Sequence, residues 1–255
     1  MIQGIIASLA AAVIGALAVF VSKNHHWLGL LWYRFLYAGR PIRVSFASLL
    51  IVQEEGRFVL VRMPRRPEAF GPFGGVYKIF SEGRRELSDL GYMAQEENSA
   101  ASAAISGDLR GTIPGRSVFK FLRWFDGERG RESSTDCLRR ELREELLEIG
   151  RVEEAALVDS LRFQRVRCVR EGPKSAGTGF DFIQIRQFDV FGLVDAEAVN
   201  QDFFARLIEA SAVSLDLLVV GAAQIIKGRA GNKVIGHHAC YLLGSKASRP
   251  ELPPF

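Results

Sequence analysis

Three carboxylates gather on one predicted helix. The segment from Asp136 to Glu148 is rich in Leu, Arg and Glu and contains no Gly or Pro, which predicts a helix. Glu141, Glu144 and Glu145 are spaced i, i+3 and i+4, so they share one face of that helix. Like charges one turn apart cost about 0.2–0.5 kcal/mol unless something neutralises them. Mg²⁺ and Mn²⁺ prefer oxygen ligands of this kind, so the three glutamates are candidate metal ligands.

The alternative interpretation of this helix is a solvated surface. Arg139, Arg140 and Arg143 would then form exposed ion pairs with the glutamates, each contributing little to stability. Arg140 adjoins the acidic face and could pair with Glu144. The helix alone does not decide between a metal site and a solvated surface.

A glycine-rich segment upstream favours a site. Phe70 to Lys78 reads FGPFGGVYK, and its glycines and proline prevent a regular helix and allow close approach of the backbone to a ligand. Gly74 and Gly75 are therefore candidate nucleotide contacts. Arg62 precedes this segment and could contact phosphates, or it could belong to an ordinary basic surface.

The pattern resembles the box of the Nudix family, which reads Gly, five residues, Glu, seven residues, then Arg-Glu-apolar-any-Glu-Glu-any-Gly-apolar. The residues at matching positions are Glu132, Arg140, Glu141, Leu142, Glu144 and Glu145. The two box glycines fall instead on Asp126 and Leu147, and residues 79–129 separate the box from the glycine segment. The resemblance implies an α/β (α+β) fold, a Nudix-like α/β/α sandwich with a mixed sheet.

The same resemblance implies a nucleoside-diphosphate-type ligand bound through Mg²⁺ or Mn²⁺. Glu141, Glu144 and Glu145 would hold the metal, and Arg140 would orient the carboxylates and help to bind the nucleotide. If the protein is a hydrolase, Glu144 and Glu145 would be its catalytic residues.

The elements around the box are predicted from hydrophobic periodicity and turn residues. They are a hairpin of residues 44–53 and 57–63, strands at 161–170 and 180–191, helices at 196–210 and 215–227, and a strand or helix end at 234–243. Ser134, Thr135 or Asp136 could cap the box helix, and Gly150 could end it. We expect a Nudix-like domain over residues 44–247, with an insertion at 79–129 and a frayed tail at 248–255.

The excess positive charge lies at the N-terminus. The chain has 33 Lys and Arg against 29 Asp and Glu. Residues 1–43 hold four of the basic residues and no acid, so the other 212 residues carry 33 − 4 = 29 basic residues against 29 acidic ones. A neutral body gives no indication of a nucleic-acid polymer as partner.

The three cysteines favour a reducing compartment. Neither a disulfide framework nor a metal motif is matched by Cys137, Cys168 and Cys240.

The N-terminal segment predicts a membrane anchor over residues 1–43. Ile2 to Val21 has no charged residue and would span about 30 Å as a helix, so we expect a transmembrane helix at residues 2–22. A cleaved signal peptide is the alternative, although no basic residue precedes the apolar run. Residues 26–38 could form a short second span or an interfacial helix.

Charge and small residues give this anchor an orientation and a partner. Basic residues follow the apolar run and none precedes it, which places the body in the cytoplasm by the positive-inside rule. The small residues Gly4, Ser8, Ala12 and Ala16 recur every four positions and predict self-association into a homo-oligomer within the bilayer.

An anchor, a long insertion and a divergent box together resemble the SMODS-associated NUDIX domains, membrane-NUDIX effectors of bacterial CBASS antiphage defence. The segments that carry this resemblance are Asp108–Arg110, Pro114–Gly115, Trp124–Phe125, Cys137–Leu142 and Ile235–His238. It implies a receptor in the bacterial inner membrane that binds a cyclic oligonucleotide made by a partner nucleotidyltransferase and then disrupts the membrane. Such a receptor would not require a metal. The competing hypotheses are a membrane-tethered Nudix hydrolase and a scaffold with solvated glutamates.

Overall fold

The computed structural model describes residue 15 and residues 38–64, 66–95, 107–175, 183–194 and 197–246. Three predicted segments lie outside these ranges. They are the helix at 2–22 apart from residue 15, the second helix at 26–38 apart from residue 38, and the tail at 248–255. Within them, no helix has both the length and the apolar character needed to cross a bilayer.

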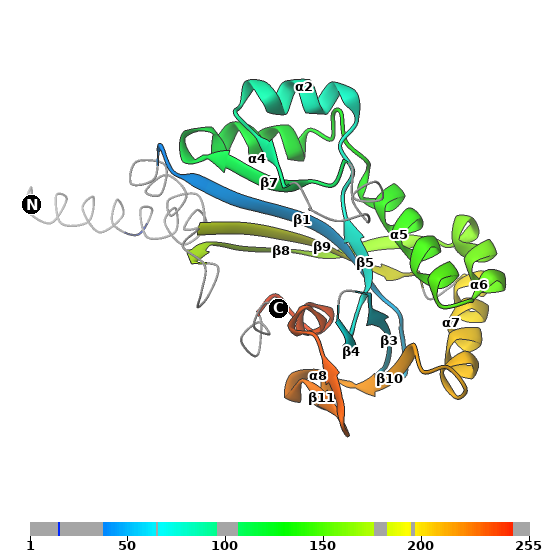
Figure 1. Ribbon diagram of the computed structural model, residues 1–255. Coiled ribbons are helices and arrows are strands. Elements are labelled where there is room, and N and C mark those ends of the chain that lie inside the picture. Colours follow the sequence, from blue (N-terminus) through cyan, green and yellow to red (C-terminus); the bar gives the residue numbers. More distant parts are fainter. Residues whose placement is uncertain are drawn as a thin grey trace, which may run out of the picture.

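Strands and helices are mixed along the chain, with five strands before the first helix of the domain (Figure 1). The strands are β1 (Pro41–Ile51), β2 (Gln53–Glu54), β3 (Arg57–Met63), β4 (Arg66–Gly71), β5 (Phe73–Val76), β6 (Met93–Ala94), β7 (Arg110–Pro114), β8 (Phe163–Ser175), β9 (Ile183–Leu193), β10 (Leu217–Gly221), β11 (Arg229–Ala230) and β12 (Lys233–Ile235). The α-helices are α2 (Ser81–Asp89), α4 (Val118–Asp126), α5 (Ser134–Glu148), α6 (Val152–Leu157), α7 (Ala198–Ser211) and α8 (Ala222–Lys227). Short 3₁₀ turns are η1 (Gly115–Ser117), η2 (Val158–Ser160) and η3 (His237–Leu242).

The described strands form two mixed sheets. The first has the order β6-β7-β1-β9-β8, and β5 pairs with β1 beside this path. The second has the order β10-β3-β4-β12-β11, and β2 pairs with β3. Each sheet contains one parallel pair, β1 with β9 and β4 with β12. The α/β (α+β) class is confirmed, whereas the single mixed sheet is replaced by two.

Helices cover both sheets. In Figure 1, α2 and α4 lie over the first sheet, α5, α6 and α7 stand together at one end, and α8 lies by the second sheet. The rings of Phe121 and Phe125 on α4 meet Phe46 of β1 edge-on, at centroid distances of 5.3 and 4.5 Å. Each fully buried aromatic or aliphatic side chain of this kind contributes about 1.5–3 kcal/mol.

Two sequence predictions of local structure are wrong. Residues 44–53 and 57–63 form a hairpin only at the turn, where Gln53 pairs with Phe58, because β1 leaves to pair with β5, β7 and β9 of the first sheet. Residues 215–227 are not one helix. Leu217–Gly221 is a strand that pairs with β3, and the helix begins only at Ala222. Pairing with another strand overrides the local pattern in both places.

The insertion at 79–129 is built of regular secondary structure. It includes α2, β6, β7 and α4 among its described residues. Strand β7 pairs with β1, with Ile113 opposite Ile42, and both side chains are buried. The insertion therefore contributes a strand and a covering helix to the same core as the rest of the first sheet.

Candidate functional site

Helix α5 presents the glutamates because its other face is buried. Leu138, Leu142 and Leu146 are completely buried in the core, which fixes the rotation of the helix. Its N-cap is Ser133, whose hydroxyl accepts a hydrogen bond from the Asp136 amide at 3.2 Å, rather than any of the three residues expected. The helix ends at Glu148, and Gly150 follows with a φ of 74°.

The two glycines of β5 are required for different reasons. A Cβ on Gly74, whose φ is 128°, would lie 2.1 Å from the carbonyl oxygen of Ser48 on β1. A Cβ on Gly75 would lie 2.1 Å from the carboxyl carbon of Glu141. The glycine segment therefore packs directly against the box helix, as the family resemblance implied.

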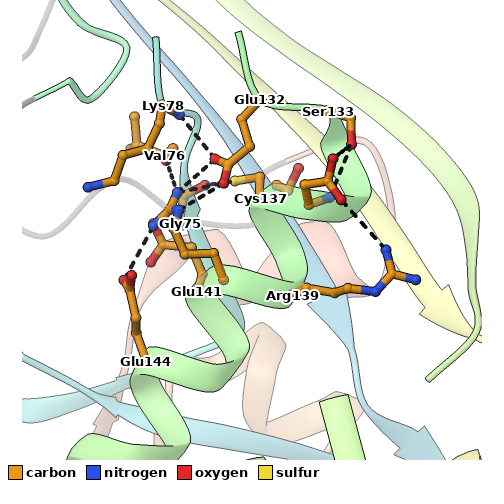
Figure 2. A network of polar contacts seen from close by, with 12 residues as sticks. Gly75, Val76, Lys78, Glu132, Ser133, Cys137, Arg139, Glu141 and Glu144 are labelled. Atoms are coloured by element: carbon orange, nitrogen blue, oxygen red, sulfur yellow. Dashed lines mark hydrogen bonds and ion pairs between the residues drawn. The ribbon is translucent and has the colours of Figure 1, made fainter. Parts of the chain in front are cut away.

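Arg140 connects the carboxylates (Figure 2). Its Nε and Nη2 donate to the two oxygens of Glu132, each at 2.9 Å. Its Nη1 donates to Glu141 at 2.7 Å and to Glu144 at 3.3 Å, and Nη2 also donates to the carbonyl of Val76 at 2.9 Å. Burial acts to lower the pKa of Arg140, but the hydrogen bonds to Glu132 and the charge of Glu141 outweigh it and raise that pKa. Arg140 therefore contacts three of the box carboxylates at once and is not part of a solvated surface.

Glu132 joins the loop before α5 to the end of the glycine segment. It is buried, and it accepts a hydrogen bond from the Lys78 amide at 3.1 Å. The Glu132 amide in turn donates to the Lys78 carbonyl at 2.9 Å. The ion pair between Arg140 and Glu132 thus holds together two backbone segments and one helix. Figure 2 shows Glu132 and Glu144 at opposite ends of this network of contacts.

Glu145 is held by the glycine segment rather than by Arg140. Its Oε2 accepts a hydrogen bond from the Gly74 amide at 3.0 Å. Burial raises the pKa of Glu145 well above its usual value, and Glu141 adds to the rise, while the bond from Gly74 opposes it. Burial likewise raises the pKa of Glu141, with Arg140 opposing. Keeping the carboxylates of Glu141 and Glu145 ionised in this buried environment therefore costs free energy.

The donor set of this site suits a hard divalent cation. Carboxylate oxygens are what Mg²⁺ and Mn²⁺ prefer, and a bound cation would offset the raised pKa values of Glu141 and Glu145. Glu141, Glu144 and Glu145 are the residues that would hold it. Across the described ranges, however, no three His, Cys, Asp or Glu side chains are arranged to hold a metal ion. The metal role of the glutamates stays a prediction.

Arg62 lies away from the box, on β3 of the second sheet. Its Nε forms an ion pair with Asp216 at 2.7 Å, and its other nitrogens donate to the carbonyls of Leu215 and Pro67. Gly74, Gly75 and Arg140 of the predicted nucleotide contacts are brought together, whereas Arg62 supports the connection into β10.

A buried polar group behind the site escaped the sequence analysis. The hydroxyl of Tyr77 donates to Asp189 at 2.6 Å, accepts from Ser48 at 2.8 Å, and lies 2.9 Å from the hydroxyl of Ser134 at the start of α5. Arg165 completes the ion pair with Asp189 at 2.5 Å. The signal that could have found it is Asp189 itself, an acid inside the apolar strand FDVF, because a buried acid requires partners.

One comparison with known proteins identifies a family. A family model described as SMODS-associated NUDIX domain matches residues 41–243, which is 203 of the 255 residues. Neither a curated protein nor a solved structure matches the chain.

Proposed function

We propose, from the premise that the chain belongs to the SMODS-associated NUDIX domain family, that it is a membrane-anchored receptor of bacterial antiphage defence of the CBASS type. Its Nudix domain binds a cyclic oligonucleotide made by a partner nucleotidyltransferase, and the anchor then disrupts the inner membrane. The SMODS association of the family supports an effector role. The uncharged run from Ile2 to Val21 supports the membrane part of the proposal.

One observation favours binding over turnover. The box carboxylates are already engaged, because Arg140 contacts Glu132, Glu141 and Glu144, and the Gly74 amide contacts Glu145. A carboxylate that must bind metal or accept a proton during turnover would first have to leave such a partner. A receptor has no such requirement, and the same contacts give it a preorganised framework.

A receptor also needs a route from its ligand to its anchor. The ligand must bind two arrangements of the protein with different affinities, or it could not switch them. Strand β1 begins at Pro41, within the last three residues of the predicted anchor segment 1–43, and pairs with β5 through Ser48 opposite Gly75. A change at the glycine segment can therefore reach residues 1–40 through one strand.

The test is dye leakage from liposomes that contain the full-length protein. We expect one member of a panel of cyclic di- and trinucleotides to bind and to release the dye, and its linear counterpart, the matched control, to release none. Binding without leakage at any ligand concentration would refute the membrane mechanism. A melting temperature that no nucleotide changes would refute the receptor and support a scaffold.

A Nudix hydrolase is the second candidate, because the box residues lie close together. Two contacts bring together the residues that the family resemblance implies for catalysis. They are the bidentate ion pair of Arg140 with Glu132 and the close approach of Glu141 to Gly75. Mg²⁺ or Mn²⁺ would supply the positive charge that activates water and neutralises the phosphoanhydride. The test is metal-dependent phosphate release that the double substitution Glu144→Gln, Glu145→Gln abolishes. Turnover that survives it would refute the metal ligands named here.

A further inference from the structure

A cavity lies next to the box, on the side of the insertion. Its volume is about 610 Å³, and it is lined by Lys78, Ile79, Phe80, Ser81 and Arg84. The cavity is largely open to solvent, and its volume falls in the range of small-molecule sites, about 300–1,000 Å³. The cavity is formed where the glycine segment ends and α2 begins, so it is distinct from the carboxylates on α5.

The charge of this cavity is opposite to that of the box. The described box places three glutamates around the guanidinium of Arg140 and a fourth, Glu145, on the Gly74 amide, an arrangement that repels a phosphodiester unless a cation is added. The cavity instead offers the ammonium of Lys78 and the guanidinium of Arg84. Lys78 lies 4.0 Å from Asp108, whereas Arg84 forms no ion pair with any described residue and makes one long contact, 3.5 Å, with the Ile79 carbonyl. Its remaining donors can bind a phosphate.

Phe80 adds an exposed aromatic ring beside these cations. Phe80 is 53 % exposed, whereas most of the other described phenylalanines are buried in the core. Its backbone is fixed, because its amide donates to the Gly130 carbonyl at 2.8 Å and its carbonyl accepts from the Arg84 amide at 2.9 Å. Phe80 is the N-cap residue of α2, four residues before Arg84, and both residues line the cavity. An exposed ring on a fixed backbone suits base stacking.

We propose that this cavity binds one nucleotide of the ligand, with a base stacked on Phe80 and the adjoining phosphate held by Arg84 and Lys78. The inference rests on the proposed receptor function and places its ligand on the insertion rather than on the glutamates. It also gives the box a role in transmission. The Lys78 side chain lines the cavity while its amide and carbonyl bind Glu132, so occupation of the cavity acts on the ion pair that orders α5.

The test is isothermal titration of the full-length protein in detergent with the panel of cyclic di- and trinucleotides. With the tightest ligand, we expect Phe80→Ala to raise Kd at least tenfold and Phe80→Tyr to leave it within twofold, because tyrosine keeps the ring. Arg84→Gln should raise Kd at least fivefold and weaken the dependence of Kd on salt. Arg85→Gln is the matched control, one residue further along α2 and outside the cavity lining, and should leave Kd unchanged.

The outcomes separate this inference from the function on which it rests. If the wild-type protein binds none of the nucleotides, the receptor function and the cavity proposal both fail. If the wild-type protein binds and both Phe80→Ala and Arg84→Gln bind equally well, the cavity proposal is overturned and the receptor function stands. Thermal melting checks that each variant folds, and if Phe80→Ala does not fold, the comparison of Arg84→Gln with Arg85→Gln decides.

Discussion

The contact between Gly75 and Glu141 predicts a substitution that a second substitution rescues. In Gly75→Ala the new methyl would lie 2.1 Å from the Glu141 carboxyl carbon, so the glutamate must swing away. It then loses the 2.7 Å hydrogen bond from Arg140, a charge-assisted contact at a site where the two side chains are 21 % and 19 % exposed. We expect the free energy of unfolding to fall by about 1–2 kcal/mol, which lowers Tm by about 2–8 °C for a domain of this size.

The rescue is tested by a double-mutant cycle on the full-length protein in detergent, followed by thermal melting. Glu141→Ala removes the obstructing carboxylate, so adding Gly75→Ala to that background should lower Tm by no more than about 1 °C. Gly74→Ala is the contrasting control. Its methyl would meet the Ser48 backbone, which cannot rotate away, and its φ of 128° disfavours any side chain. It should therefore cost about 3 kcal/mol or more in both backgrounds.

One result of the double-mutant cycle would contradict the contact between Gly75 and Glu141. If Gly75→Ala lowers Tm equally with and without the Glu141 side chain, the glutamate does not lie over the glycine. The argument that couples the glycine segment to the box helix would then be wrong.

Three further predictions follow from the polar contacts. Tyr77→Phe removes a buried hydroxyl with three polar neighbours and should cost about 1–3 kcal/mol; an unchanged Tm would show that the group contributes nothing. Burial raises the pKa of Glu145, so the folded protein holds this proton more tightly than the unfolded chain and loses stability as pH rises through that pKa. Glu145→Gln keeps an acceptor for the Gly74 amide and should raise Tm more at pH 8 than at pH 5, whereas equal shifts at both pH values would contradict the raised pKa. Arg140→Lys cannot keep a bidentate ion pair and should cost about 2–3 kcal/mol, against under about 0.5 kcal/mol for the exposed control Arg143→Lys; equal losses in the two variants would mean that the fork geometry is unimportant.

The box helix could be predicted from sequence because its determinants are local. An uninterrupted run of helix formers, leucines at helical spacing and Gly150 beyond the end specify the rotation and the length of α5 without reference to other segments. The spacing of the glutamates then follows. The contact with Gly75 is not local, and it was expected only because the two motifs resemble a known pair.

The errors arise where distant segments decide the outcome. Leu217–Gly221 has apolar residues that fit a helix, but β3 offers it a strand ladder. Phe80 and Arg84 lie in a polar stretch without a clear period, so nothing in the sequence separates them from other surface residues. Only the fold shows that they line a cavity beside the end of the glycine segment.

The path of β1 has a mechanical consequence. This strand starts at Pro41 and reaches Ser48, opposite Gly75, over roughly 23 Å at ~3.3 Å per residue. It is hydrogen-bonded to β7 on one side and to β9 on the other, so it resists bending. The stretch from Pro41 to Ser48 is therefore a stiff connection between the start of the described domain and the strand that carries Gly75, and stiffness, rather than distance, sets how well its two ends communicate.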